Sequence, residues 1–112
     1  MCEIDVGSWE GLTIDDVRAR FPTQEKLAWS SGWDGGETYD ELDDRVVAAL
    51  LELAAIHDGE HVAVVTHGGP IRSAIAASHG LSFEEARPLF EPLANCAVVR
   101  VMVEKGAVQR LD

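Results

Sequence analysis

Positive charge is scarce in this chain of 112 residues. It holds 9 lysine and arginine residues against 20 aspartate and glutamate residues, which gives a formal net charge of −11. Nucleic acids and anionic membrane surfaces both attract proteins through basic faces, so we expect neither as a partner. The excess of negative charge is concentrated in residues 1–60, with 15 acidic and 4 basic residues, whereas residues 61–112 hold five of each.

Cysteine is also scarce, and long apolar runs are absent. The two cysteines, Cys2 and Cys96, are too few for a disulfide framework, although a single bridge between them stays open as an alternative. No apolar run approaches the roughly 18 residues of a membrane-spanning helix. Residues 1–5 have neither a basic start nor an apolar stretch, so they do not resemble a signal peptide. These features favour a reduced, cytoplasmic setting.

The clearest predicted element is a helix over residues 38–57. Thr38 and Glu41 form a capping box, and apolar residues follow at helical spacing. Four acidic residues in its first two turns complement the helix dipole and are expected to be solvated: Asp40, Glu41, Asp43 and Asp44. Further helices are predicted over residues 12–20, 70–80 and 82–88, and a loop with a short helical piece over residues 23–36.

Two strands and a hairpin arm complete a single α/β domain over residues 1–112. The run HVAVVT at residues 61–66 is short, β-branched and almost wholly apolar, which is typical of a strand covered on both faces in a parallel sheet. Residues 96–103 are predicted as the second strand, and residues 107–111 as its hairpin partner across a tight turn. Helices and strands in this order predict a layered α/β fold.

The most informative segment is HGGP at residues 67–70. It places His67 at the carboxyl end of a buried strand, where open α/β sheets bind ligands. Gly68 and Gly69 let backbone N–H groups approach an anion, and the N-terminus of the next helix adds a favourable field. These are the physical needs of a phosphate site. Taken alone, the pattern also fits a histidine in a tight turn whose glycines only supply positive φ angles.

Two other chemistries fit these residues less well. A lipase-type oxyanion hole needs a Gly-x-Ser-x-Gly elbow, and the stretch GSWEG at residues 7–11 has its serine in the wrong place. A metal-dependent hydrolase would use His57, His61 and His67, whose spacing is not that of a convincing ligand set. We expect His57, His61 and His79 to be surface or capping residues.

Four short segments together carry a family resemblance. They are EIDVGSWEGLT at residues 3–13, GGET at 35–38, VVTHGG at 64–69 and LANC at 93–96. In this order and with these gaps they resemble the histidine phosphatase superfamily, in particular its phosphoglycerate-mutase-like and alpha-ribazole-phosphatase-like branch. The resemblance implies a layered αβα fold of the phosphoglycerate mutase type. It also implies phosphoryl transfer or hydrolysis of small phosphate esters through a phosphohistidine, with no metal or other cofactor.

The resemblance further implies roles for individual residues. Glu3 matches the family's proton donor and acceptor, and His67 matches the histidine that stabilises the transferring phosphoryl group. Gly68 matches the residue whose backbone N–H binds the phosphate. Glu37 is expected to shape the rim of the pocket, and Asn95 to lie near the site. The first two roles suit the chemistry, because a carboxylate can protonate a leaving oxygen and an imidazolium offsets developing negative charge.

The sequence departs from the family in one major respect. It contains no Arg-His-Gly motif, whose histidine is the family's phosphorylated nucleophile, and it lacks the arginine that precedes the glutamate motif. We therefore expect an incomplete fold without the N-terminal strand and helix, and a chain that is inactive alone. It is either a truncated domain or a non-catalytic binding or oligomerising module. An exposed strand edge favours a homo-oligomer.

Overall fold

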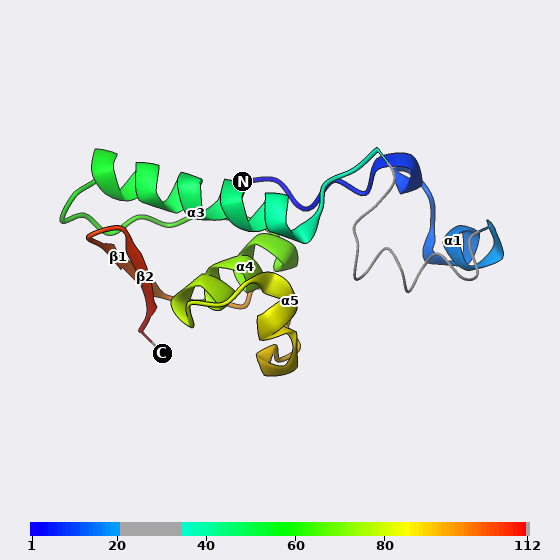
Figure 1. Cartoon of the computed structure of the whole chain (residues 1–112). Helices are drawn as coiled ribbons and strands as arrows, with labels where there is room; N and C mark the ends of the chain where they lie inside the picture. Colours follow the sequence, from blue (N-terminus) through cyan, green and yellow to red (C-terminus); the bar gives the residue numbers. More distant parts are fainter. Residues whose placement is uncertain (21–34, 112) are drawn as a thin grey trace.

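The computed structural model describes residues 1–20 and 35–111 (Figure 1). In this part of the chain, helix α3 packs against α4, α5 and the first strand, and α4 packs against the second strand. Helix α1 lies at the opposite end of the molecule from the hairpin (Figure 1). The elements are η1 (Gly7–Trp9), α1 (Ile14–Arg20), α3 (Tyr39–Ile56), α4 (Gly68–Ser78), α5 (Phe83–Ala86), η2 (Arg87–Leu89), β1 (Val101–Glu104) and β2 (Ala107–Arg110).

Helices α1, α3 and α5 begin at the predicted capping residues. At α3 the Thr38 hydroxyl accepts a hydrogen bond from the Glu41 backbone N–H at 3.1 Å, and the Glu41 carboxylate accepts one from the Thr38 N–H at 3.3 Å. Each pair satisfies two donors that a helix start otherwise leaves unbonded. The same reciprocal pair joins Ser82 and Glu85 at α5, and Thr13 and Asp16 at α1. The predicted end of the first helix at Phe21-Pro22, and the predicted loop as far as residue 34, lie outside the described residues.

The predicted hairpin is confirmed, although its first arm is shorter than expected. β1 and β2 pair antiparallel, with Val103 opposite Val108. Lys105 and Gly106 both have positive φ angles, 52° and 76°, as a type I′ hairpin turn requires. The first arm was expected to begin at Cys96, but that residue lies in a turn with a φ of 63°, and pairing starts only at Val101.

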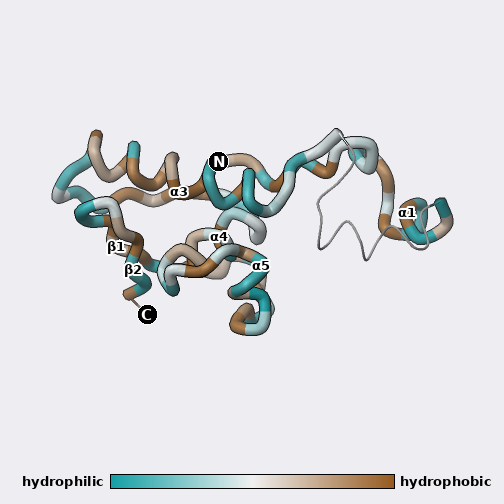
Figure 2. Tube along the Cα trace, in the orientation of Figure 1, coloured by the Kyte–Doolittle hydropathy of each residue, from teal (hydrophilic) through white to brown (hydrophobic). Residues whose placement is uncertain are grey.

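The predicted buried strand over residues 61–66 is wrong. In the part of the chain that the structure describes, β1 and β2 make the only sheet, and residues 61–66 are extended but unpaired. Val65 is 93% exposed, and Val62 and Val64 are also exposed. The apolar residues of this segment run alongside α3 (Figure 2). A β-branched run becomes a strand only where a neighbour pairs its backbone, and none of the described residues does so.

The core lies where α3 crosses α4 and α5. Tyr39, Leu42, Val46 and Phe83 are buried together, and the rings of Tyr39 and Phe83 stack with centroids 4.3 Å apart. The N-terminal segment joins this core through half-buried apolar side chains, which are Met1, Ile4, Val6 and Trp9. Apolar packing therefore brings the segment that carries Glu3 next to the start of α4.

Candidate functional site

Helix α4 begins at the glycine pair singled out in the sequence. His67 is the N-cap residue, with extended φ and ψ of −126° and 171° and no side-chain capping bond. Gly68 and Gly69 are the first two helical residues and Pro70 is the third, so the helix starts two residues earlier than predicted. The first N–H groups of a helix have no partner inside it, so those of Gly68 and Gly69 point out of the helix toward whatever acceptor lies there.

The carboxylate of Glu3 lies on this helix start. Its Oε2 accepts a hydrogen bond from the Gly69 N–H at 3.1 Å, and its Oε1 accepts one from the Ile4 N–H at 2.8 Å. A Cβ atom added at Gly69 would collide with the Glu3 carboxylate, so glycine permits this close approach. The structure thus brings together Glu3 and the loop of His67 and Gly68, two segments more than sixty residues apart.

A guanidinium that the sequence analysis did not single out lies at the same helix start. Arg72 is half-buried on α4, four residues after Gly68, and its Nη1 lies 3.0 Å from the position that a Cβ on Gly68 would occupy. Residues four apart share a helix face and long side chains lean toward the N-terminus. The four-residue spacing between Gly68 and Arg72 could have been recognised in the sequence. Arg72 therefore adds positive charge at Gly68.

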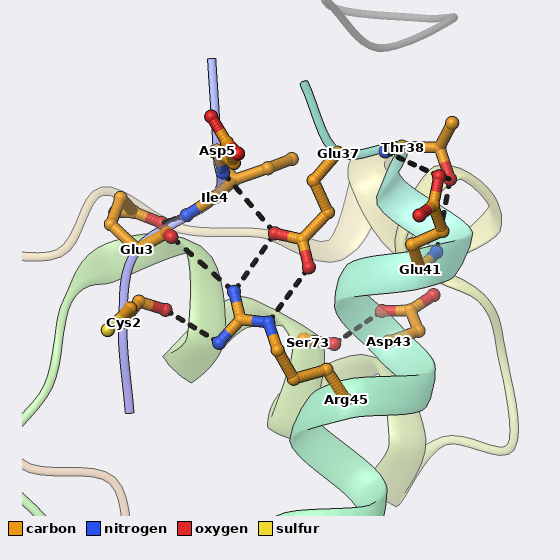
Figure 3. Close-up of polar contacts among 10 residues, drawn as sticks. All are labelled: Cys2, Glu3, Ile4, Asp5, Glu37, Thr38, Glu41, Asp43, Arg45 and Ser73. Atoms are coloured by element: carbon orange, nitrogen blue, oxygen red, sulfur yellow. Dashed lines mark hydrogen bonds and ion pairs between the residues drawn. The ribbon is translucent and has the colours of Figure 1, made fainter. Parts of the chain in front are cut away.

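Glu37 and Arg45 form the wall of a pocket next to Glu3 (Figure 3). The Arg45 guanidinium binds the Glu37 carboxylate in a bidentate pair, with Nε to Oε2 at 2.8 Å and Nη2 to Oε1 at 3.0 Å. The hydrogen bond from Arg45 holds the pKa of Glu37 below its ordinary value. Glu37 and Glu3 line this pocket together with Cys2, Asp5, Gly36, Glu41 and Arg45. The expected role of Glu37 at the rim of a phosphate site stays a prediction.

Tyr39 links the site to the core. Burial is the main cause that raises the pKa of its hydroxyl, and the negative charge of Glu3 adds to the rise. The Arg87 guanidinium lies over the Tyr39 ring, 5.0 Å from its centroid, and also forms an ion pair with Glu84 at 2.7 Å. The Tyr39 ring is therefore fixed by stacking on Phe83 and by a cation.

Asn95 has no hydrogen bond that would tie it to the site in the described part of the chain. It is exposed in the turn before Cys96, and no hydrogen bond joins it to Glu3 or His67 within the described residues. Its predicted place near the site stays a prediction.

The remaining histidines lie outside the site. His57 and His79 are the C-cap residues of α3 and α4, and His61 is exposed, which confirms the expected surface or capping positions. Within residues 1–20 and 35–111, no group of three or more histidine, cysteine, aspartate and glutamate side chains is arranged to hold a metal ion. None of the described helices is long and apolar enough to cross a bilayer.

Several proteins of known sequence are similar to this chain. It is 41% identical over 76 residues to a metal-independent phosphoserine phosphatase of Arabidopsis thaliana, which covers 63% of this chain and 32% of the relative. It is 36% identical to phosphoglycerate mutase-like protein 4 of the same plant, over 77% of this chain and 36% of the relative. The chain is 34% identical to a 2,3-bisphosphoglycerate-dependent phosphoglycerate mutase of Brucella anthropi, over 74% of this chain and 43% of the relative. The chain thus spans less than half the length of these curated relatives.

Two solved structures share the fold. The YhfR protein of Bacillus stearothermophilus superposes with a TM-score of 0.80 at 26% identity, over 96% of this chain and 55% of that protein. The Rv3214 product of Mycobacterium tuberculosis superposes with a TM-score of 0.66 at 30% identity, over 98% of this chain and 55% of that protein. These matches confirm the predicted α/β fold of the phosphoglycerate mutase type, of which the described helices and hairpin form a part. The family model of the histidine phosphatase superfamily (branch 1) matches residues 1–111, and the chain belongs to that superfamily.

Proposed function

We propose that the start of α4 is the phosphoryl-binding and acid/base part of a site for small phosphate esters. The observation that carries this proposal is the Glu3 carboxylate on the Gly69 N–H, one helix turn from Arg72 and two residues from His67. Such a site combines a proton donor, an imidazole, a guanidinium and the Gly68 N–H at one helix start. Each of these groups acts on either the phosphoryl oxygens or the leaving group.

The roles follow from the chemistry of each group. In a complete domain, a nucleophilic histidine that this chain lacks would take the phosphoryl group as a phosphohistidine. Glu3 in its protonated form then donates a proton to the leaving oxygen of the ester, and its carboxylate later takes one from the water that hydrolyses the phosphohistidine. The His67 imidazolium and the Gly68 N–H bind the phosphoryl oxygens as negative charge develops, and Arg72 reinforces them. The phosphate ester is a small molecule of the kind named by the relatives, phosphoserine or phosphoglycerate. We place the protein in the cytoplasm on its cysteine usage.

The chain alone should show negligible turnover of p-nitrophenyl phosphate. Among the described histidines, only His67 lies at the site, and it is assigned to phosphate binding rather than to nucleophilic attack. A steady-state assay at neutral pH checks this, with the His67→Ala variant as the control for contaminating phosphatases. Robust hydrolysis that disappears in His67→Ala would show that the chain holds a complete catalytic site.

Phosphate binding is the direct test of the proposed site. Titration with inorganic phosphate, phosphoserine and 3-phosphoglycerate should shift the backbone amide resonances of His67 and Gly68 in a saturable way, at weak affinity. His67→Ala and Arg72→Met should each weaken the binding about tenfold, because each removes a charge-assisted hydrogen bond worth roughly 1.5–3 kcal/mol. Chloride at equal ionic strength is the control. Shifts that are spread over the surface, or unchanged in both variants, would overturn the proposal.

A second candidate function, a non-catalytic oligomerising module, rests on a different observation. Ile56, Val64 and Val65 are exposed by 64%, 40% and 93%, beside an extended backbone that has no strand partner among residues 1–20 and 35–111. A second copy of the chain would cover this apolar edge. Light scattering should therefore give the mass of a dimer, and Val65→Lys should return it to a monomer. A wild-type monomer that does not bind a hydrophobic dye would contradict this function.

A further inference from the structure

We infer that Arg45, paired with Glu37, is a positioning residue that fixes Glu3 on the start of α4. The inference rests on the proposed role of Glu3 and adds to it the origin of its placement. Arg45 belongs to α3, and in the described part of the chain its hydrogen bonds go to Glu37 and to the backbone of Cys2 and Glu3, so it acts through the segment that carries Glu3.

The guanidinium of Arg45 reaches that segment from α3. Its Nη1 donates to the carbonyl oxygen of Cys2 at 3.0 Å, and its Nη2 donates to the carbonyl oxygen of Glu3 at 3.4 Å (Figure 3). Its other two hydrogen bonds hold the Glu37 carboxylate, so one rigid planar group orients both the acid and the segment. A guanidinium suits this task because its donors point in fixed directions.

Glu37 holds the same segment on the far side of Glu3. Its Oε1 accepts from the Asp5 N–H at 3.3 Å, and its own N–H donates to the Asp5 carbonyl oxygen at 2.8 Å. Gly36 lies so close that an added Cβ would meet the backbone of residues 5–7. The backbone is thus fixed at residues 2 and 3 by Arg45 and at residue 5 by Glu37, which leaves Glu3 only its side-chain rotations.

Packing alone does not hold the Glu3 carboxylate in place, because Glu3 itself is exposed. Other ties hold the segment as a whole, since Thr66 donates to the Met1 carbonyl oxygen at 2.7 Å and Ile4 packs against the core. Loss of Arg45 should therefore disorder the carboxylate of Glu3 without releasing the segment or unfolding the helices.

The amide of Gly69 reports this placement directly, without any ligand. We expect Arg45→Met to move the Gly69 amide resonance toward its position in Glu3→Ala and to make its hydrogen exchange about tenfold faster, as the loss of one charge-assisted hydrogen bond implies. The Ile75 amide, in the second half of α4, should be unchanged. Arg45→Lys keeps the charge but should preserve only part of the wild-type shift and slow exchange of the Gly69 amide, because lysine lacks the planar fork of donors. Arg18→Met, on the distant α1, is the matched control.

The outcomes separate this inference from the proposed function. A Gly69 amide that is unchanged in both Arg45 variants, while Glu3→Ala shifts it, would overturn the positioning role and leave the phosphate titration unaffected. If Arg45→Met unfolds, the decision passes to Arg45→Lys and Glu37→Gln, each of which keeps part of the network and should give an intermediate shift. A failure of phosphate to shift His67 would instead overturn the proposed function, because the Gly69 measurement contains no phosphate.

Discussion

Replacing Asp43 with alanine should lower the free energy of unfolding by about 2–4 kcal/mol, because two donors would lose their acceptor. The Asp43 carboxylate accepts from the hydroxyl of Ser73 on α4 and from the backbone N–H of Phe83 at 2.8 Å. Ser73 is 1% exposed, so water cannot replace the lost acceptor. One side chain on α3 thus joins α3 to α4 and to the first residue of α5. Chemical denaturation followed by circular dichroism measures the loss.

Asp43→Asn and Asp44→Ala are the matched controls for this prediction. Asparagine has the same shape, and its amide can accept from the Phe83 N–H and donate to the Ser73 hydroxyl, so Asp43→Asn should stay within about 1 kcal/mol of the wild type. Asp44 is the next residue on α3 and is exposed, so its removal should matter little. Equal losses in Asp43→Ala and Asp44→Ala would contradict the bridging role.

The pH dependence of stability provides an independent check on Asp43. Burial raises the pKa of its carboxyl group, and the nearby charges of Asp40 and Asp44 add to the rise. A carboxyl whose pKa is raised on folding binds its proton more tightly in the folded chain, so its contribution to stability falls as the pH rises above roughly 4. The wild type should therefore lose stability relative to Asp43→Asn between about pH 4 and neutral pH. A pH-independent difference would show that burial does not govern this group.

The elements that the sequence predicted correctly depend on local interactions. Capping boxes join residues three apart, and the turn at Lys105 and Gly106 depends on two adjacent φ angles. The strand prediction over residues 61–66 was wrong because a strand needs a partner from elsewhere in the chain, and the composition of the segment itself does not reveal whether there is one. Asp43 was expected to be solvated with its acidic neighbours. It lies four residues after the buried Tyr39 and so shares its helix face, a signal that was present in the spacing.

The distinction between local and long-range interactions applies to the candidate site as well. The family resemblance, and not local pattern, predicted that Glu3 and His67 belong to one site. In the structure the Glu3 carboxylate accepts a hydrogen bond from the Gly69 N–H, two residues after His67. Arg72 could have been found from its spacing to Gly68. Arg45 could not, because its partners Cys2 and Glu3 are 43 and 42 residues away in the sequence. Long-range polar contacts to backbone carbonyl groups leave no local sequence signature.

Glu3→Gln should strengthen the binding of inorganic phosphate about tenfold, because a carboxylate within several Å of a bound phosphate repels it by roughly 1–2 kcal/mol near a protein surface. In the structure the Glu3 carboxylate already occupies the Gly69 N–H, so it competes with an anion for the same donor. Glutamine keeps the shape and the acceptor but removes the charge. The affinity can be measured from the saturation of the Gly68 amide shift.

The repulsion can be separated from the overall charge of the chain. Glu10→Gln changes the net charge by the same amount at an exposed residue beyond η1, so it should leave phosphate binding nearly unchanged. Gly69→Ala offers a second route, since the new Cβ displaces the Glu3 carboxylate from the helix start and should also strengthen binding. The gain in Glu3→Gln should shrink as salt is added, because exposed charges are screened within about 8–10 Å at physiological ionic strength. Equal affinities in Glu3→Gln and the wild type at low salt would mean that Glu3 does not face the bound phosphate.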